Sequence, residues 1–137
     1  MKPIGLAAAA FLFDEAGRVL LILENYGHRR FGPPGGRVEP GESPAEAAVR
    51  ETREEVGIEI GIDHLVGVRT WEDSYRRRWL GFAFRAEILG GEPTIASPWE
   101  IADVGWFDPA APPQPLTRLA ERFLLPASRG ERGLVES

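Results

Sequence analysis

The segment from Ser43 to Gly57 constrains this chain most, because its sequence fixes both ends of one helix. Ser43 suits an N-cap, Pro44 suits the first helical position, and Glu46 stands where a capping box needs it. Gly57 stands where helices commonly end in a left-handed residue. Between these ends, small and apolar residues recur at helical spacing, at Ala45, Ala48, Val49, Thr52 and Val56. The pattern predicts a helix over residues 44–56 with one buried face.

Three glutamates lie on a single stripe of this expected helix. Glu51, Glu54 and Glu55 follow i, i+3, i+4 spacing, and each pair of like charges so placed costs about 0.2–0.5 kcal/mol. Arg50 and Arg53 could compensate from the flank, as on an ordinary salt-bridged surface. A divalent cation could also compensate, since Mg²⁺ prefers carboxylate oxygens and bridges to substrate phosphates. The helix alone favours the surface interpretation.

The loop before the helix reverses that preference. The run Gly36-Arg-Val-Glu-Pro-Gly-Glu42 supplies a glycine-rich turn and another carboxylate, and Arg50-Glu-Thr-Arg-Glu-Glu-Val-Gly-Ile58 follows after seven residues. Together they resemble the motif of the Nudix hydrolases, the MutT-like nucleotide pyrophosphohydrolases. Thr52 departs from the aliphatic residue usual there, and Phe31 stands near a tryptophan of many members. Neither departure involves an expected metal ligand.

The resemblance implies an α/β fold, a Nudix-type α/β/α sandwich with a mixed β-sheet in a single domain. The chain of 137 residues is long enough for one such core and too short for two. The domain is expected over residues 1–126. Residues 127–137 are polar and are expected to form a frayed C-terminal tail.

The resemblance also implies a metal site. Glu51, Glu54 and Glu55 would bind one or more Mg²⁺ ions, with Mn²⁺ as an alternative, and the Gly35 carbonyl would add a ligand. Arg50 would orient a helix carboxylate. A metal-activated water would then attack phosphorus and split a nucleoside diphosphate linked to another group.

Two carboxylates have less certain roles in that site. The general base varies across the family, and Glu54 is our choice for it. Glu100 lies in the loop before the expected strand 104–107, where many relatives carry a glutamate. We weigh a metal ligand at Glu100 evenly against an ordinary exposed loop residue.

Substrate contacts are expected from two segments, the loop that leads to the motif and a basic, aromatic turn between two strands. Arginine pairs with phosphate, and aromatic rings stack on bases. The first segment contributes Arg30, Phe31 and Gly36, and the second contributes Trp71, Tyr75, Arg76 and Arg78. A solvated hairpin tip explains Arg76–Arg78 at least as well.

The remaining elements follow from apolar runs and turn residues. Residues 4–13 and 18–24 are expected to pair as a hairpin through Asp14–Gly17, which argues against a signal peptide. A long loop is expected over 25–41 and a helix over 116–125. Further strands are expected at 58–62, 65–70, 79–89 and 104–107. No run is long enough to span a membrane, so a cytoplasmic location is the default expectation.

Three functions compete. The first is a pyrophosphohydrolase acting on a small nucleotide, such as a nucleoside triphosphate, an oxidised one or ADP-ribose. The second is a non-catalytic nucleotide-sensing module, which the retained glutamates disfavour. The third is an RNA 5′-end pyrophosphohydrolase, disfavoured by the net charge of −5. We expect no DNA partner and an RNA partner is unlikely on this charge, while a monomer and a homodimer both stay open.

Overall fold

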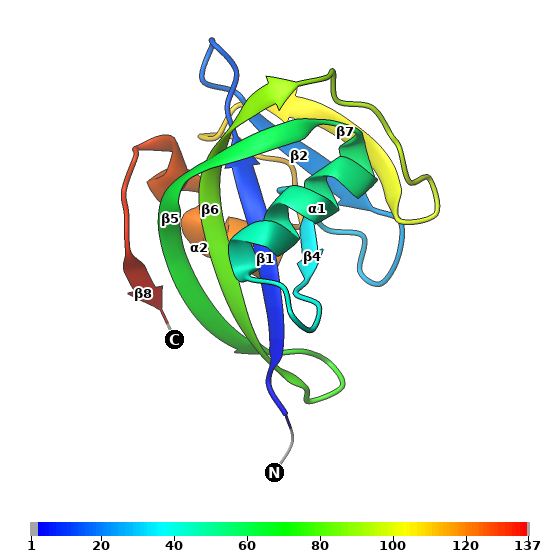
Figure 1. Ribbon diagram of the computed structural model, residues 1–137, viewed down its shortest axis with the longest axis vertical. Helices are drawn as coiled ribbons and strands as arrows, with labels where there is room; N and C mark the ends of the chain where they lie inside the picture. The colour runs from blue at the N-terminus through cyan, green and yellow to red at the C-terminus, as the bar shows by residue number, and fades with distance from the viewer. Residues whose placement is uncertain (1–2, 137) are drawn as a thin grey trace.

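The computed structural model describes residues 3–136 and shows two β-sheets with one helix on each side (Figure 1). The larger sheet has the order β4-β1-β6-β5-β8, and the smaller has the order β3-β2-β7. Both parallel and antiparallel pairs occur, so the predicted mixed sheet is confirmed. The elements are β1 (Gly5–Leu12), β2 (Val19–Glu24), β3 (Phe31–Gly32), β4 (Gly35–Arg37), α1 (Pro44–Val56), β5 (Glu59–Glu72), β6 (Arg78–Gly90), β7 (Ile101–Phe107), α2 (Arg118–Ser128) and β8 (Leu134–Glu136).

Strand β1 is buried on both faces, which explains its nearly continuous apolar sequence. Its side chains alternate between two cores, because successive residues of a strand point to opposite faces. Ala8 and Ala10 belong to the core that α1 covers, and Ala9 and Phe11 belong to the core that α2 covers. The predicted α/β/α sandwich in a single domain is therefore confirmed.

Helix α1 begins and ends where the sequence predicts. The Ser43 side chain accepts from the Glu46 N–H at 3.1 Å, and the Glu46 carboxylate accepts from the Ser43 N–H at 2.9 Å. Gly57 adopts φ 73°, the left-handed conformation expected of it. Thr52 is fully buried, and its hydroxyl donates to the Ala48 carbonyl at 2.7 Å. That bond satisfies the polar atom at a position where an aliphatic side chain is usual.

Three predictions about strands are wrong. Strands β1 and β2 do not form a ladder: they lie in different sheets and share a single bridge, Phe13 to Val19. The expected loop over residues 25–41 contains β3 and β4, which pair with β2 and β1. The expected separate strands 58–62 and 65–70 are one continuous β5, because irregularities beside His64 and Gly67 absorb the extra residues without a turn.

The C-terminal segment also differs from expectation. Helix α2 begins at Arg118 and continues through Pro126 to Ser128, whereas the expected helix covered residues 116–125. The tail does not fray over its described part, because β8 pairs in parallel with the edge of β5. Backbone pairing to a sheet edge, together with packing of Leu134 against the core, thus orders this segment. Within residues 3–136, no helix is long and apolar enough to cross a membrane.

Candidate metal and substrate site

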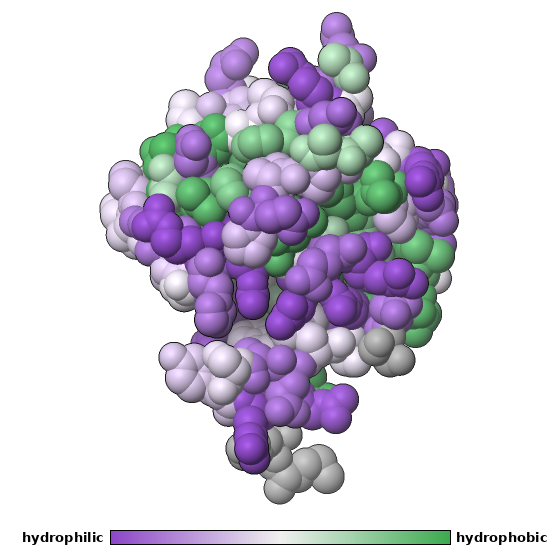
Figure 2. Space-filling view, turned by 180° about the vertical axis from the view of Figure 1, so that it is seen from behind, coloured by the Kyte–Doolittle hydropathy of each residue, from purple (hydrophilic) through white to green (hydrophobic). Residues whose placement is uncertain are grey.

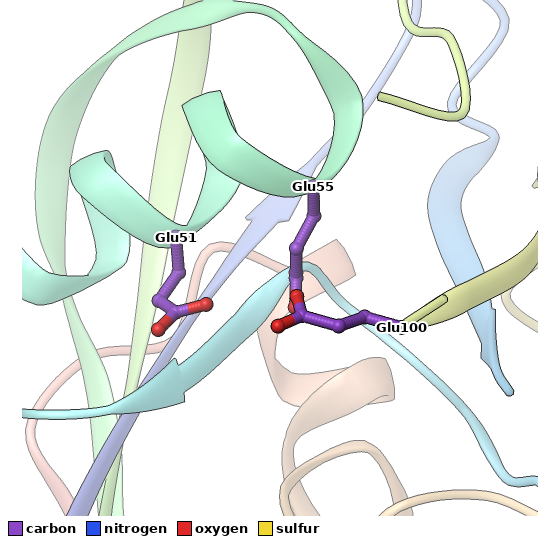
Figure 3. Close-up of side chains that lie close together, drawn as sticks. All are labelled: Glu51, Glu55 and Glu100. Atoms are coloured by element: carbon purple, nitrogen blue, oxygen red, sulfur yellow. The ribbon is translucent and has the colours of Figure 1, made fainter. Parts of the chain in front are cut away.

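Three carboxylates converge at one edge of the larger sheet (Figure 3). Glu51 and Glu55 point from the same face of α1, one turn apart, and Glu100 approaches from the loop before β7. One oxygen of each lies within 4.8 Å of the others. Like charges this close repel unless a cation or protons neutralise them.

The loop that carries Glu100 is tied to the end of β2. The Asn25 N–H donates to the Glu100 carbonyl at 2.8 Å, and the Asn25 side chain donates to the Pro98 carbonyl at 3.0 Å. Ser97 is buried at the start of the same loop. These bonds bring Glu100 to the helix carboxylates, which favours the ligand interpretation over that of an ordinary loop residue.

Glu55 is the most buried member of the cluster, only 4% exposed. Burial, together with the nearby charges of Glu51 and Glu100, raises the pKa of its carboxyl to about 9, although the Gly35 N–H acts in the opposite direction. That N–H donates to the Glu55 carboxylate at 2.9 Å. A carboxylate held in such surroundings gains most from a cation placed between it and its neighbours.

The donor set fits a hard divalent cation. Carboxylate oxygens are the ligands that Mg²⁺ takes, and Mg²⁺ also retains water molecules and binds substrate phosphates. Glycines leave room beside the cluster: a Cβ at Gly36 would lie 2.6 Å from the carboxyl carbon of Glu51. The three carboxylates therefore form an acidic, partly buried site whose oxygen atoms suit Mg²⁺ as ligands.

Arg50 hydrogen-bonds to carboxylates on the outer side of this acidic site. It donates to both oxygens of Glu42, at 2.7 and 3.0 Å, and to Glu51 at 3.0 Å. The hydrogen bonds from Arg50 lower the pKa of Glu42 to about 2. Arg53, which could also have compensated the glutamate stripe, instead pairs with Glu59 at the start of β5. Of these two helix arginines, it is Arg50 that hydrogen-bonds to the glutamate stripe, at Glu51 and Glu54.

Two connected cavities extend from the carboxylates along the sheet. The first, about 200 Å³, begins at Gly35 and Glu55 and has Ala7 and Ala9 of β1 in its lining. The second, about 770 Å³, lies between the loop after β2 and the tip of the β5–β6 hairpin. Figure 2 shows a hollow in the lower half of the molecule's reverse side, bordered mostly by hydrophilic side chains. The residues shared by both linings are Glu24, Tyr26, Arg30, Trp71 and Arg118.

Comparison with known proteins decides the family. A model of the NUDIX domain matches residues 3–125. The chain belongs to the Nudix family.

Individual relatives support this assignment over different lengths. The chain is 40% identical over 103 residues to the NAD-capped RNA hydrolase NudC of Pseudomonas entomophila, covering 74% of this chain and 36% of that protein. It thus spans about a third of the length of such relatives. A MutT NUDIX hydrolase from Burkholderia pseudomallei superposes with a TM-score of 0.84 at 29% identity, covering 90% of this chain and 98% of its own. An ADP-ribose pyrophosphatase from Streptococcus suis gives 0.76 at 25%, covering 98% of each chain.

The Nudix helix carries one predicted ligand that lies outside the cluster. Glu54 has 54% of its side chain exposed and accepts from Arg50 at 3.2 Å. Its roles as ligand and general base stay predictions, as do the ligand roles of Glu51, Glu55, Glu100 and the Gly35 carbonyl. Gly35 contributes its N–H to Glu55 in this structure.

The predicted substrate residues divide into two groups. Arg30, Gly36, Trp71 and Tyr75 line one or both cavities. Phe31, Arg76 and Arg78 are absent from these two linings. Phe31 instead packs edge-on against Phe107, with ring centroids 5.9 Å apart, because it lies in the short strand β3.

Among the residues shared by both cavity linings, sequence reasoning missed three. Glu24 ends β2, Tyr26 lies in the following loop, and Arg118 begins α2. None belongs to a motif, and their shared position depends on how distant segments fold together. The expected long loop over residues 25–41 was a sequence signal for Tyr26 alone, because long loops in compact domains are often functional.

Proposed function

We propose that this Nudix domain is a Mg²⁺-dependent pyrophosphohydrolase that cleaves a nucleoside diphosphate linked to another group. The observation that carries the proposal is the approach of Glu51, Glu55 and Glu100 within 4.8 Å, beside a cavity lined by arginines and aromatic side chains. Mn²⁺ is an alternative cation. A nucleoside triphosphate, an oxidised one and ADP-ribose all contain the required bond.

Glu51, Glu55 and Glu100 would hold the cation, with the Gly35 carbonyl and Glu54 beside them. When bound, the cation would neutralise phosphate charge and lower the pKa of the attacking water. Arg50 fixes the Glu51 carboxylate, so less reorganisation is needed as charge develops. Glu54 is exposed and accepts a single bond from Arg50, so it has free lone pairs to take a proton from water.

Arg30 and Arg118 supply positive charge where the two cavities meet. A guanidinium pairs with phosphate oxygens through parallel N–H donors. Trp71 and Tyr26 border the same junction and offer faces on which a ring can stack. These residues would orient the substrate so that its anhydride bond lies at the carboxylate end.

RNA 5′-end hydrolysis is a second candidate. The name of the Pseudomonas relatives and the aromatic cavity support it, since single-stranded nucleotides bind by stacking. The acidic net charge and the shared length of only about a third count against it. NAD-capped and triphosphate RNA therefore belong in any substrate panel.

The test is Mg²⁺-dependent phosphate release from nucleoside triphosphates, ADP-ribose, nucleotide sugars and capped RNA, with and without added phosphatase. Wild type is compared with Glu51→Gln, and Glu87→Gln serves as an exposed control on β6. Turnover that needs metal and is lost only in Glu51→Gln supports the proposal. Tight nucleotide binding without turnover on the whole panel would replace it with a sensing module.

A further inference from the structure

The second cavity has a lining that a pyrophosphate does not require. Four aromatic side chains border it, and most of its other side chains carry oxygen atoms, two of them glutamates. The aromatic residues are Tyr26, Trp71, Tyr75 and Trp79. Rings of this kind next to carboxylates suit a ligand with both apolar faces and hydroxyl groups, because the rings contact C–H surfaces while carboxylates accept from O–H groups.

The two tryptophans form a fixed platform. Their rings stack with centroids 6.4 Å apart and planes inclined by 15°. Each ring lies over a glycine of a neighbouring strand: a Cβ would come within 2.5 Å of Trp71 at Gly81 and 2.7 Å of Trp79 at Gly5. The indole N–H of Trp79 donates to Asp73 at 3.0 Å. The platform is therefore positioned before any ligand arrives.

Two glutamates line the same space. Glu24 is half-buried and accepts only two long hydrogen bonds, from the Tyr26 hydroxyl and the Arg30 N–H, each at 3.3 Å. A carboxylate offers about four acceptor sites, so Glu24 keeps capacity for a ligand. Glu72 is exposed at the rim and has no ion pair within residues 3–136.

The arginines of the hairpin tip do not supply this cavity. Arg76 and Arg78 lie outside its lining, and the Arg77 guanidinium packs over the Trp79 ring at 4.7 Å and lines a separate pocket. The cations that line it, Arg30 and Arg118, stand at its junction with the carboxylate end. A terminal phosphate placed further along would meet Glu72 and Asp73, which line only the second cavity, rather than arginines, and like charges repel.

We propose that this cavity binds a sugar ring on the far side of the scissile bond, so that the substrates are nucleoside diphosphates esterified to a ribose or another sugar rather than nucleoside triphosphates. This inference rests on the proposed function for the cleavage step. Water adds to one phosphorus, the bridging P–O bond breaks, and the products are a nucleoside monophosphate and a sugar phosphate, with the released proton taken up by solvent.

The first test compares kcat/KM for ADP-ribose, UDP-glucose, ATP and dGTP in wild type, Glu72→Gln and the matched control Glu87→Gln. We expect at least one sugar ester to exceed both triphosphates by tenfold or more. Glu72→Gln should lower kcat/KM for that ester about tenfold, chiefly through KM, because a charge-assisted hydrogen bond is weakened. The triphosphates should change less than twofold. Equal or better triphosphate turnover, or equal losses on all substrates, would overturn the inference.

The second test does not depend on catalysis. Ribose 5-phosphate, glucose 1-phosphate and inorganic phosphate are titrated into the metal-free protein while tryptophan fluorescence is followed. Tighter binding of one sugar phosphate than of inorganic phosphate, weakened in Glu72→Gln, supports the sugar site and tells ribose from hexose. Identical binding of all three ligands contradicts it. Sugar-phosphate binding without hydrolysis of any substrate would reject the proposed function while retaining the sugar site.

Discussion

The carboxylate end of the cleft and its far end under the β5–β6 hairpin are held by different interactions. At the carboxylate end, one helix supplies two of three glutamates, and Arg50 and the Gly35 N–H bind them directly. At the far end, the hairpin tip depends on Asp73, whose carboxylate accepts from the N–H groups of Tyr75 and Arg77 at 2.9 Å. The first end is highly charged, and the second carries aromatic side chains beside a turn that projects from the sheet (Figure 1).

This difference suggests separate roles for the two ends: one would act on the phosphorus atom, and the other would select the rest of the substrate. Groups that act on phosphorus must be placed closely, and a helix packed on a sheet provides that placement. Groups that select the rest of the substrate can lie on a hairpin, where substitutions disturb the core less. We therefore expect changes at the carboxylate end to affect every substrate alike, and changes at the hairpin to alter preference.

Glu55→Gln should have the largest effect. The substitution keeps the shape of the side chain and removes the charge that would hold a cation, so turnover should fall by more than roughly a hundredfold, beyond the loss typical of residues that only support a ligand. The loss should be the same for each hydrolysed substrate. Steady-state kinetics across the panel checks this, with Glu87→Gln as control. A loss confined to one substrate would show that Glu55 acts in substrate selection rather than in the cleavage step.

Gly36→Ala should have the next largest effect. The added methyl group would lie 2.6 Å from the carboxyl carbon of Glu51, so that carboxylate must move. We expect a loss of about 10–100-fold in kcat/KM, with weaker Mg²⁺ activation. Gly90→Ala is the matched control, because a methyl group there meets nothing within 4 Å. Unchanged Mg²⁺ dependence in Gly36→Ala would show that Glu51 is not held by the space beside it.

The same two ends differ in how far the sequence could predict them. Helix α1 was predictable to the residue, because Ser43, Pro44 and Gly57 are local signals that act within one turn. Its glutamates could be recognised for the same reason. Glu100 could only be weighed evenly, since its approach depends on a backbone bond from Asn25, a residue far earlier in the chain.

The far end was predicted only in part, for a physical reason. Trp71 and Tyr75 were expected in the substrate site, and they do line the second cavity. Arg118 was missed, because which residues line a cavity depends on contacts between distant segments rather than on composition. The pairing of β8 with β5 was also missed. A strand pairs with a sheet edge through free backbone N–H and C=O groups, and a side-chain pattern does not show where these groups are free.

Asp73→Ala should have a smaller effect that is confined to substrate preference. Hydrogen bonds from the Trp79 indole and two backbone N–H groups lower the pKa of Asp73 and hold the hairpin tip. Their loss should loosen the platform and lower kcat/KM for sugar esters about fivefold, the effect of roughly 1 kcal/mol. Mg²⁺ activation should not change. Asp63→Ala, at an exposed position of β5, is the control, and an equal loss on triphosphates would contradict the prediction.

Thermal unfolding of the metal-free protein should show the sign of the Glu55 contribution to stability. In the unfolded chain the Glu55 carboxyl releases its proton near the ordinary glutamate pKa of 4.5, whereas the folded protein retains that proton up to about 9. Folded protein binds more protons in that window, so its stability falls as pH rises. Metal-free Glu55→Gln should therefore melt above wild type at pH 8, by about 4 °C for each 1 kcal/mol, and the gap should close towards pH 5. Adding Mg²⁺ should raise the wild-type Tm more than the variant's. A wild type that melts higher at pH 8 without metal would mean that Glu55 is stabilised by the protein alone, and the carboxylate end would then not be built around a cation.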